Sequence, residues 1–146
     1  MLAPHVLVVD DHQLYRETFC SLLLGSFPHL DIVTASDGSE ALSLTARTRF
    51  ALVVLDYQLP SLTGGDVVRH LRARSRTGMP MPAVVLTSTQ PDVPRFARML
   101  GVDGFLPKPT SADELQVLIG PLLARPRHEA SLAGPRLWHI RPRPAS

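Results

Sequence analysis

Acidic side chains follow two apolar runs of this 146-residue chain at the points where the runs end. Asp10 and Asp11 come directly after the run at 6–9, and Asp56 comes directly after the run at 51–55. Carboxylates that lie close together repel one another, and Mg²⁺ removes this repulsion because it prefers oxygen ligands. A carboxylate can also act as a nucleophile and form an acyl phosphate. If the fold brings them together, these acids predict a Mg²⁺-dependent phosphoryl-transfer site.

Hydroxyl groups and a lysine follow the two later apolar segments. Thr87 and Ser88 come after the run at 83–86, and Lys108 follows the short segment 104–106. Lys108 is the only lysine among the 15 basic residues of the chain. Its ammonium offers a compact charge to a phosphate, and the hydroxyls offer hydrogen bonds. Each feature taken singly is more typical of a helix cap or a loop, so the prediction depends on their joint placement at strand ends.

The apolar runs are typical of strands buried on both faces of a parallel sheet, because they are short, β-branched and without polar alternation. Helical patterns lie between them. We expect strands at 6–9, 30–35, 51–55, 83–86 and 104–106, and helices at about 13–24, 38–48, 65–73, 93–100 and 112–124. Strands that alternate with helices pair in parallel through right-handed crossovers. The chain is therefore predicted to form a doubly wound α/β domain, (βα)₅.

Two of these helices have distinct start signals. Ser111 and Glu114 fit a capping box, in which each side chain satisfies a free backbone N–H of the first turn. Prolines crowd the start of the fourth helix, which is expected to begin at Asp92 or Val93 and to end near Leu100. In an open parallel sheet, ligands bind outside the carboxyl ends of the strands. The predicted fold would bring six polar residues to that edge: Asp10, Asp11, Asp56, Thr87, Ser88 and Lys108.

The joint pattern resembles the response-regulator receiver family over about residues 5–124. The resemblance rests on four segments: Val-Asp-Asp-His at 9–12, Leu-Asp-Tyr-Gln-Leu-Pro at 55–60, Leu-Thr-Ser at 86–88 and Gly-Val-Asp-Gly-Phe-Leu-Pro-Lys-Pro at 101–109. It implies a five-stranded parallel sheet in the flavodoxin-like order 2-1-3-4-5. It also implies a bacterial two-component signalling protein that is phosphorylated by a histidine kinase or a phosphotransfer protein.

The resemblance implies a role for each acid. Asp56 is the phosphoacceptor. Asp11, Asp56 and the backbone carbonyl of Gln58 bind Mg²⁺ directly, whereas Asp10 acts through water. On this interpretation the chain is not an enzyme with a separate substrate, because it catalyses its own phosphorylation and dephosphorylation.

The resemblance also implies a switch. Lys108 contacts the phosphoryl group, Ser88 lies beside it, and the bond between Lys108 and Pro109 is cis. Thr87 moves toward the phosphate, and Phe105 moves inward with it, although Phe105 lacks the hydroxyl of a tyrosine. The fourth helix, fifth strand and fifth helix would then present an altered face to a downstream protein.

Composition limits the alternatives. The chain is 45% hydrophobic and 19% charged, and it contains a single cysteine, Cys20, which excludes an internal disulfide and a cysteine metal cage. No apolar run approaches the roughly 20 residues of a membrane span, and the N-terminus lacks a signal-peptide pattern. We therefore expect a cytoplasmic protein.

The sequence leaves open a homodimer. It disfavours an aspartate-nucleophile phosphatase, because no acid stands two residues after Asp56.

The net charge of +2 is divided unequally. Residues 1–124 hold ten basic and twelve acidic residues, whereas 125–146 hold five arginines and one glutamate. We interpret 1–124 as the receiver domain and 125–146 as a Pro/Arg-rich basic tail, too short for an output domain. The alternative function is a nucleic-acid-binding accessory regulator, in which the tail arginines contact phosphates and Trp138 stacks on a base. A solubilising or folded-back tail is the competing interpretation.

Overall fold

The computed structural model describes residues 3–125. Apart from Arg125, the predicted tail lies outside the described residues. Strands and helices alternate along the described part. The strands are β1 (His5–Val9), β2 (Asp31–Ala35), β3 (Leu52–Asp56), β4 (Ala83–Ser88) and β5 (Gly104–Pro107). The helices are α1 (Gln13–Ser26), α2 (Gly38–Arg47), α3 (Gly64–Ser75), α4 (Val93–Leu100) and α5 (Ala112–Ala124). No helix within residues 3–125 combines the length and the apolar character that crossing a membrane requires.

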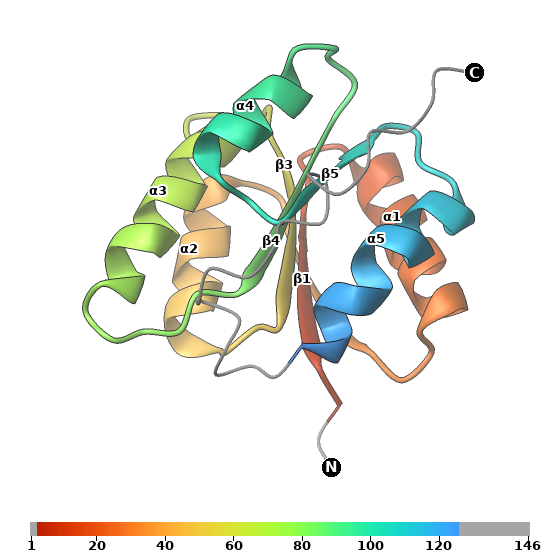
Figure 1. Ribbon diagram of the computed structural model, residues 1–146, viewed down its shortest axis with the longest axis horizontal. Helices are drawn as coiled ribbons and strands as arrows, with labels where there is room; N and C mark the ends of the chain where they lie inside the picture. Colours follow the sequence, from red (N-terminus) through yellow and green to blue (C-terminus); the bar gives the residue numbers. More distant parts are fainter. Residues whose placement is uncertain (1–2, 126–146) are drawn as a thin grey trace.

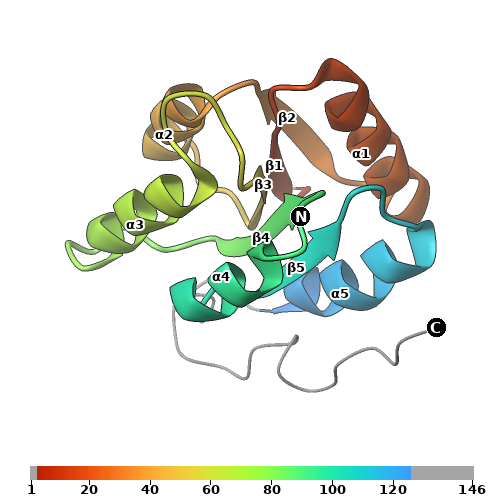
Figure 2. The same cartoon turned by 90° about the horizontal axis from the view of Figure 1, so that it is seen from above.

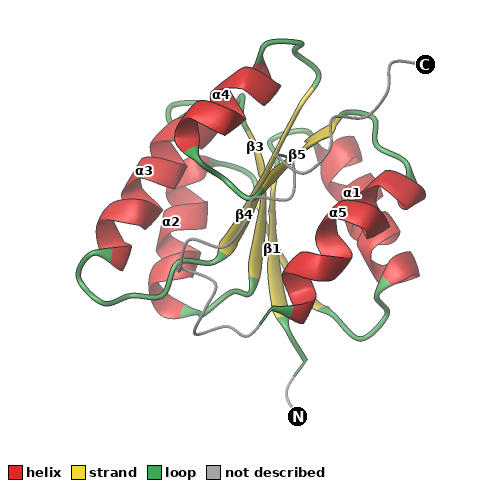
Figure 3. Ribbon diagram, in the orientation of Figure 1, coloured by secondary structure: helices red, strands yellow, loops and turns green. Residues whose placement is uncertain are grey.

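The strands form one parallel sheet in the order β2-β1-β3-β4-β5. Helices α1 and α5 cover one face, and α2, α3 and α4 cover the other (Figures 1 and 2). Figure 3 shows the resulting three layers, with the strands between the two helical layers. The predicted doubly wound α/β class, with its order 2-1-3-4-5, is confirmed.

The core consists of two apolar clusters, one on each face of the sheet. Alternate residues of β3 supply both: Val53 and Leu55 belong to the cluster beneath α2, α3 and α4, whereas Leu52 and Val54 belong to the cluster beneath α1 and α5. Successive side chains of a strand point to opposite faces. Both faces are covered, so the central residues of β1, β3 and β4 are apolar without polar alternation, which explains the continuous runs in the sequence.

Three strands, β3, β4 and β5, continue beyond the segments from which they were predicted. Asp56 is the last residue of β3, and Thr87 and Ser88 are the last two residues of β4. The register pairs Asp56 with Thr87, and Ser88 with Pro107. The predicted ends at 55, 86 and 106 were therefore too early. The reason is that the backbone hydrogen bonds of a neighbouring strand, rather than side-chain hydrophobicity, decide where a strand ends.

The helix starts agree with the sequence signals. The capping box of Ser111 and Glu114 is present at the start of α5, and α4 begins at Val93 as expected. A second capping box, which was not predicted, joins Thr63 and Asp66 at the start of α3. Such a cap stabilises a helix by about 1 kcal/mol. This one anchors the C-terminal end of the loop that follows Asp56.

Candidate functional site

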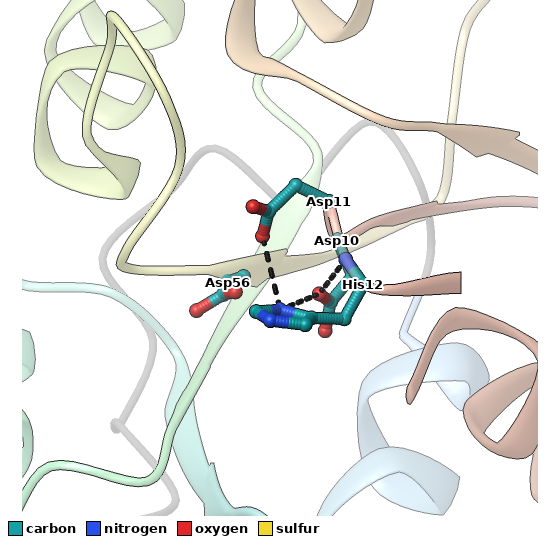
Figure 4. A group of neighbouring side chains, drawn as sticks. All are labelled: Asp10, Asp11, His12 and Asp56. Carbon is teal, nitrogen blue, oxygen red and sulfur yellow. Dashed lines mark hydrogen bonds and ion pairs between the residues drawn. The ribbon is translucent and has the colours of Figure 1, made fainter. Parts of the chain in front are cut away.

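The acidic side chains predicted from the sequence meet at the carboxyl end of the sheet (Figure 4). One potential ligand atom from each of Asp10, Asp11, His12 and Asp56 lies within 4.8 Å of the others. Asp10 and Asp56 are buried, whereas Asp11 and His12 are exposed. The ends of β1 and β3, which are adjacent strands, thus bring together acids that are far apart in the sequence.

Lys108 lies between the two buried carboxylates. Its Nζ is 2.6 Å from Asp10 Oδ2 and 2.9 Å from Asp56 Oδ2. All three side chains are at most 5% exposed, so water screens these ion pairs weakly. The other oxygen of Asp56, Oδ1, accepts a hydrogen bond of 3.0 Å from the backbone N–H of Gln58. Both oxygens of the proposed phosphoacceptor are therefore held in place. The Lys108–Pro109 bond is cis, as the resemblance implied.

Burial and the neighbouring charges shift the pKa values of Asp56 and Lys108 in opposite directions. Burial raises the pKa of the Asp56 carboxyl, and the hydrogen bonds from Lys108 and Gln58 only partly offset this effect. Burial lowers the pKa of the Lys108 ammonium, but its hydrogen bonds to Asp10 and Asp56 outweigh burial and raise that pKa overall. Lys108 is accordingly a cation at neutral pH.

The donor set at this edge fits Mg²⁺. The cluster holds three carboxylates, and Lys108 pairs with only two of them, so negative charge stays uncompensated where the carboxyl oxygens converge. Hard divalent cations prefer such oxygen ligands, and Mg²⁺ keeps several waters, which the partly exposed Asp11 side chain leaves room for. Asp10, Asp11 and Asp56 would hold the ion. The role of the Gln58 carbonyl as a ligand stays a prediction.

The hydroxyl residues of β4 occupy different surroundings. Thr87 is buried and pairs in register with Asp56, which places the predicted switch residue next to that carboxylate. The Ser88 hydroxyl accepts a hydrogen bond of 2.9 Å from the backbone N–H of Gln90, so it closes a local turn. Phe105 is partly buried against the cluster beneath α2, α3 and α4. The coupled movement of Thr87 and Phe105 stays a prediction.

Two residues at the start of α1 contribute to the site and were not predicted to do so. His12 stands at the N-cap of α1, and its Nδ1 is 3.3 Å from Asp11 Oδ1. The ring of Tyr15 lies over Lys108, with Nζ 4.6 Å from the ring centroid. The spacing of three residues predicts that Tyr15 and His12 lie on the same face of α1. Only the orientation of α1 on the sheet shows that this face lies against Lys108.

The fold and the site together define a class: a doubly wound α/β domain with a buried aspartate–lysine cluster at the carboxyl edge of its sheet. The sequence model of the response regulator receiver domain matches residues 6–120. The chain belongs to this family, and it is a receiver domain of a two-component system.

The relatives and the similar structures agree with this assignment. The response regulator MprA of Mycobacterium sp. (strain KMS) is 38% identical over 136 residues, which cover 92% of this chain and 57% of that protein. The chain thus spans about half the length of the curated relatives it matches. The structure of Vibrio cholerae chemotaxis protein CheY4 covers 82% of this chain and 98% of its own, with a TM-score of 0.69 and 26% identity.

A second similar structure shows the same fold. It is the receiver domain of sensor histidine kinase PA1611 from Pseudomonas aeruginosa PAO1, with a magnesium ion coordinated in its active site cleft. The match covers 84% of this chain and 99% of that domain, with a TM-score of 0.72 and 23% identity.

Proposed function

We propose that this receiver domain accepts a phosphoryl group on Asp56, in a Mg²⁺-dependent reaction, from a histidine kinase or a phosphotransfer protein. The observation that carries the proposal is the position of Lys108, whose Nζ bridges Asp10 and Asp56 at 2.6 and 2.9 Å beside the third carboxylate, Asp11. Phosphoryl transfer depends mainly on positioning and on neutralisation of charge. This cluster provides both.

The reaction forms one bond and breaks one. A carboxylate oxygen of Asp56 attacks the phosphorus of a phosphohistidine, the new O–P bond forms, and the N–P bond of the donor breaks with its electron pair returning to the imidazole. The hydrogen bonds from Lys108 and Gln58 orient the Asp56 carboxylate for this attack. Lys108 then stabilises the charge on the phosphoryl oxygens. Bound Mg²⁺ supplies further positive charge there and offsets the repulsion among the carboxylates. The magnesium in the PA1611 receiver domain supports this part of the proposal.

The proposed product is a signal rather than a released compound. The chain would catalyse its own phosphorylation and dephosphorylation, and phosphorylation would alter the face formed by α4, β5 and α5 toward a downstream protein. The cytoplasmic location stays a prediction, and the question of a homodimer stays open. The nucleic-acid alternative depends on the tail at 125–146. All of this tail except Arg125, including Trp138, lies outside the described residues, so the alternative stays a prediction.

Asp56→Asn tests the site directly. Incubation with acetyl phosphate and Mg²⁺ is expected to add one phosphoryl group to the wild-type chain and none to the variant, because an amide is not a nucleophile for this transfer. Intact-mass spectrometry measures the addition. Asp113→Asn, which alters an exposed carboxylate in the first turn of α5, is the matched control and should be phosphorylated normally. Phosphorylation of Asp56→Asn at the wild-type level would contradict the proposal.

Thr87→Ala separates phosphorylation from switching. The variant should still be phosphorylated, since its backbone pairing with Asp56 is kept. Its α4 and β5, however, should no longer change conformation when the phosphoryl group or its mimic is bound. Amide hydrogen exchange, with and without the phosphoryl mimic beryllofluoride, measures this response. A coupling between two sites of this kind typically changes an equilibrium constant by about 5- to 150-fold. Ser43→Ala, on the exposed side of α2, should respond as the wild type does. An unchanged response in Thr87→Ala would refute the switch role.

A further inference from the structure

We propose that Tyr15 is a positioning residue for the phosphoryl-transfer reaction: the face of its ring holds the Lys108 ammonium in place and keeps water from it. The inference rests on the proposed function of the site and assigns a role to a residue outside the acidic cluster. Its basis is the placement of Lys108 Nζ 4.6 Å from the centroid of the Tyr15 ring. A cation at this distance from an aromatic face is attracted by the ring quadrupole.

The ammonium of Lys108 is held from three directions. Two are carboxylates, Asp10 at 2.6 Å and Asp56 at 2.9 Å, and the third is the Tyr15 ring. The Lys108 side chain is only 5% exposed, so these groups rather than water surround its charge. A charge that is already desolvated and oriented does not have to reorganise when the phosphoryl group arrives.

An aromatic ring is suited to the third direction for an electrostatic reason. A third carboxylate beside Lys108 would hold the ammonium as well, but it would add negative charge to a site that must admit an anionic phosphoryl group. The ring attracts the cation without a net charge of its own and covers it with an apolar surface.

The ring is carried by a firmly anchored element. Helix α1 buries Phe19 and Leu23 in the core, at 5% and 0% exposure. Arg16, the residue after Tyr15, donates a hydrogen bond of 2.7 Å to the backbone carbonyl of Asp10. His12 meets the Tyr15 ring edge-to-face at a centroid distance of 5.9 Å. These contacts fix the first turn of α1 relative to the end of β1, and hence the ring relative to Lys108.

The hydroxyl of Tyr15 has no part in this arrangement, because it makes no hydrogen bond within residues 3–125. Tyr15→Phe keeps the ring face and should phosphorylate and dephosphorylate within about twofold of the wild type. Tyr15→Leu keeps an apolar cover but removes the quadrupole. A desolvated cation–π contact corresponds to roughly a 5- to 30-fold effect. Tyr15→Leu should therefore slow both reactions by that factor, since the phosphoryl group that Lys108 would contact is transferred in both.

The experiment compares four proteins: wild type, Tyr15→Phe, Tyr15→Leu and the control Leu14→Ala, which alters a neighbouring side chain that is 73% exposed. Rates of phosphorylation by acetyl phosphate and of autodephosphorylation are measured by intact mass. Calorimetric titration then gives the affinity for Mg²⁺ alone and for beryllofluoride with Mg²⁺. The expected pattern for Tyr15→Leu is unchanged Mg²⁺ affinity with weaker beryllofluoride binding. Tyr15→Met replaces Tyr15→Leu if thermal unfolding shows that the latter does not fold.

Each result is decisive. Wild-type rates and beryllofluoride affinity in Tyr15→Leu would overturn the positioning role but leave the proposed function of Asp56 intact. Equal slowing in Tyr15→Phe and Tyr15→Leu would overturn the role of the ring face. A loss of Mg²⁺ affinity in Tyr15→Leu would overturn it too, because it would show a general disturbance of the site. Absence of phosphorylation in the wild type would overturn the proposed function itself.

Discussion

Lys108→Met is expected to slow phosphorylation of Asp56 by about 100- to 1000-fold, the typical cost of removing one preorganised group that stabilises transition-state charge. It is also expected to lower the free energy of unfolding by about 3 to 5 kcal/mol when divalent cations are chelated. The second effect arises because Asp10 and Asp56, both 3% exposed, would lose the cation that they share. Urea unfolding in the presence of a chelator measures the loss.

The stability of the Lys108→Met variant should depend more strongly on Mg²⁺ and on pH than the stability of the wild type. Bound Mg²⁺ should recover more stability in Lys108→Met, because it replaces the missing positive charge. The hydrogen bond and the charge of Lys108 both lower the pKa of Asp56, so their removal raises that pKa further. The folded state then binds more protons than the unfolded state, and stability in the chelator should rise as pH falls through the folded pKa.

Arg69→Met is the matched control for this prediction. Arg69 pairs with Asp66 at 3.2 Å, but its side chain is 62% exposed, and exposed ion pairs contribute about 0 to 1 kcal/mol. Its loss should change neither the phosphorylation rate nor the Mg²⁺ dependence of stability. Equal losses of stability in Arg69→Met and Lys108→Met would show that burial of the Asp10–Lys108–Asp56 cluster has no special energetic role.

Gly64→Ala should impair both folding and phosphorylation, although Gly64 is not one of the residues of the acidic cluster. A Cβ at this position would lie 2.8 Å from the backbone oxygen of Asp56 and 2.8 Å from Tyr57 Cα. These are backbone atoms, so no side-chain rotation relieves the clash, and the loop that carries Asp56 must shift. Overpacking of this kind costs about 1 to 3 kcal/mol, and a displacement of about 1 Å at a reacting group can slow a reaction about 100-fold.

The neighbouring glycine provides the control. A Cβ on Gly65 would meet its nearest atoms at 3.5 Å, which is ordinary van der Waals contact. Gly65→Ala should be neutral or stabilising by up to about 1 kcal/mol, because alanine has the higher helix propensity. Thermal unfolding and the acetyl phosphate reaction measure both variants. Similar behaviour of Gly64→Ala and Gly65→Ala would contradict the steric account of the loop.

Much of this protein was predictable from local patterns. The continuous apolar runs predicted strands buried on both faces, and Ser111 with Glu114 predicted the start of α5, because strand burial and helix capping depend on residues a few positions apart. The edge at which Asp10, Asp56 and Lys108 meet was also predictable, since parallel strands place all their carboxyl ends on one side. The strand order came from the family resemblance rather than from the pattern itself.

The remaining features depend on how elements distant in the sequence pack together. Backbone pairing with β4 makes Asp56 the last residue of β3, although the apolar run in the sequence ends one residue earlier. The angle at which α1 lies on the sheet placed Tyr15 over Lys108, 93 positions away in the numbering. The lack of space for a Cβ at Gly64 likewise depends on the path of the loop after β3. Local sequence determines which segments form strands and helices, but contacts across the domain depend on distances and orientations that only close packing decides.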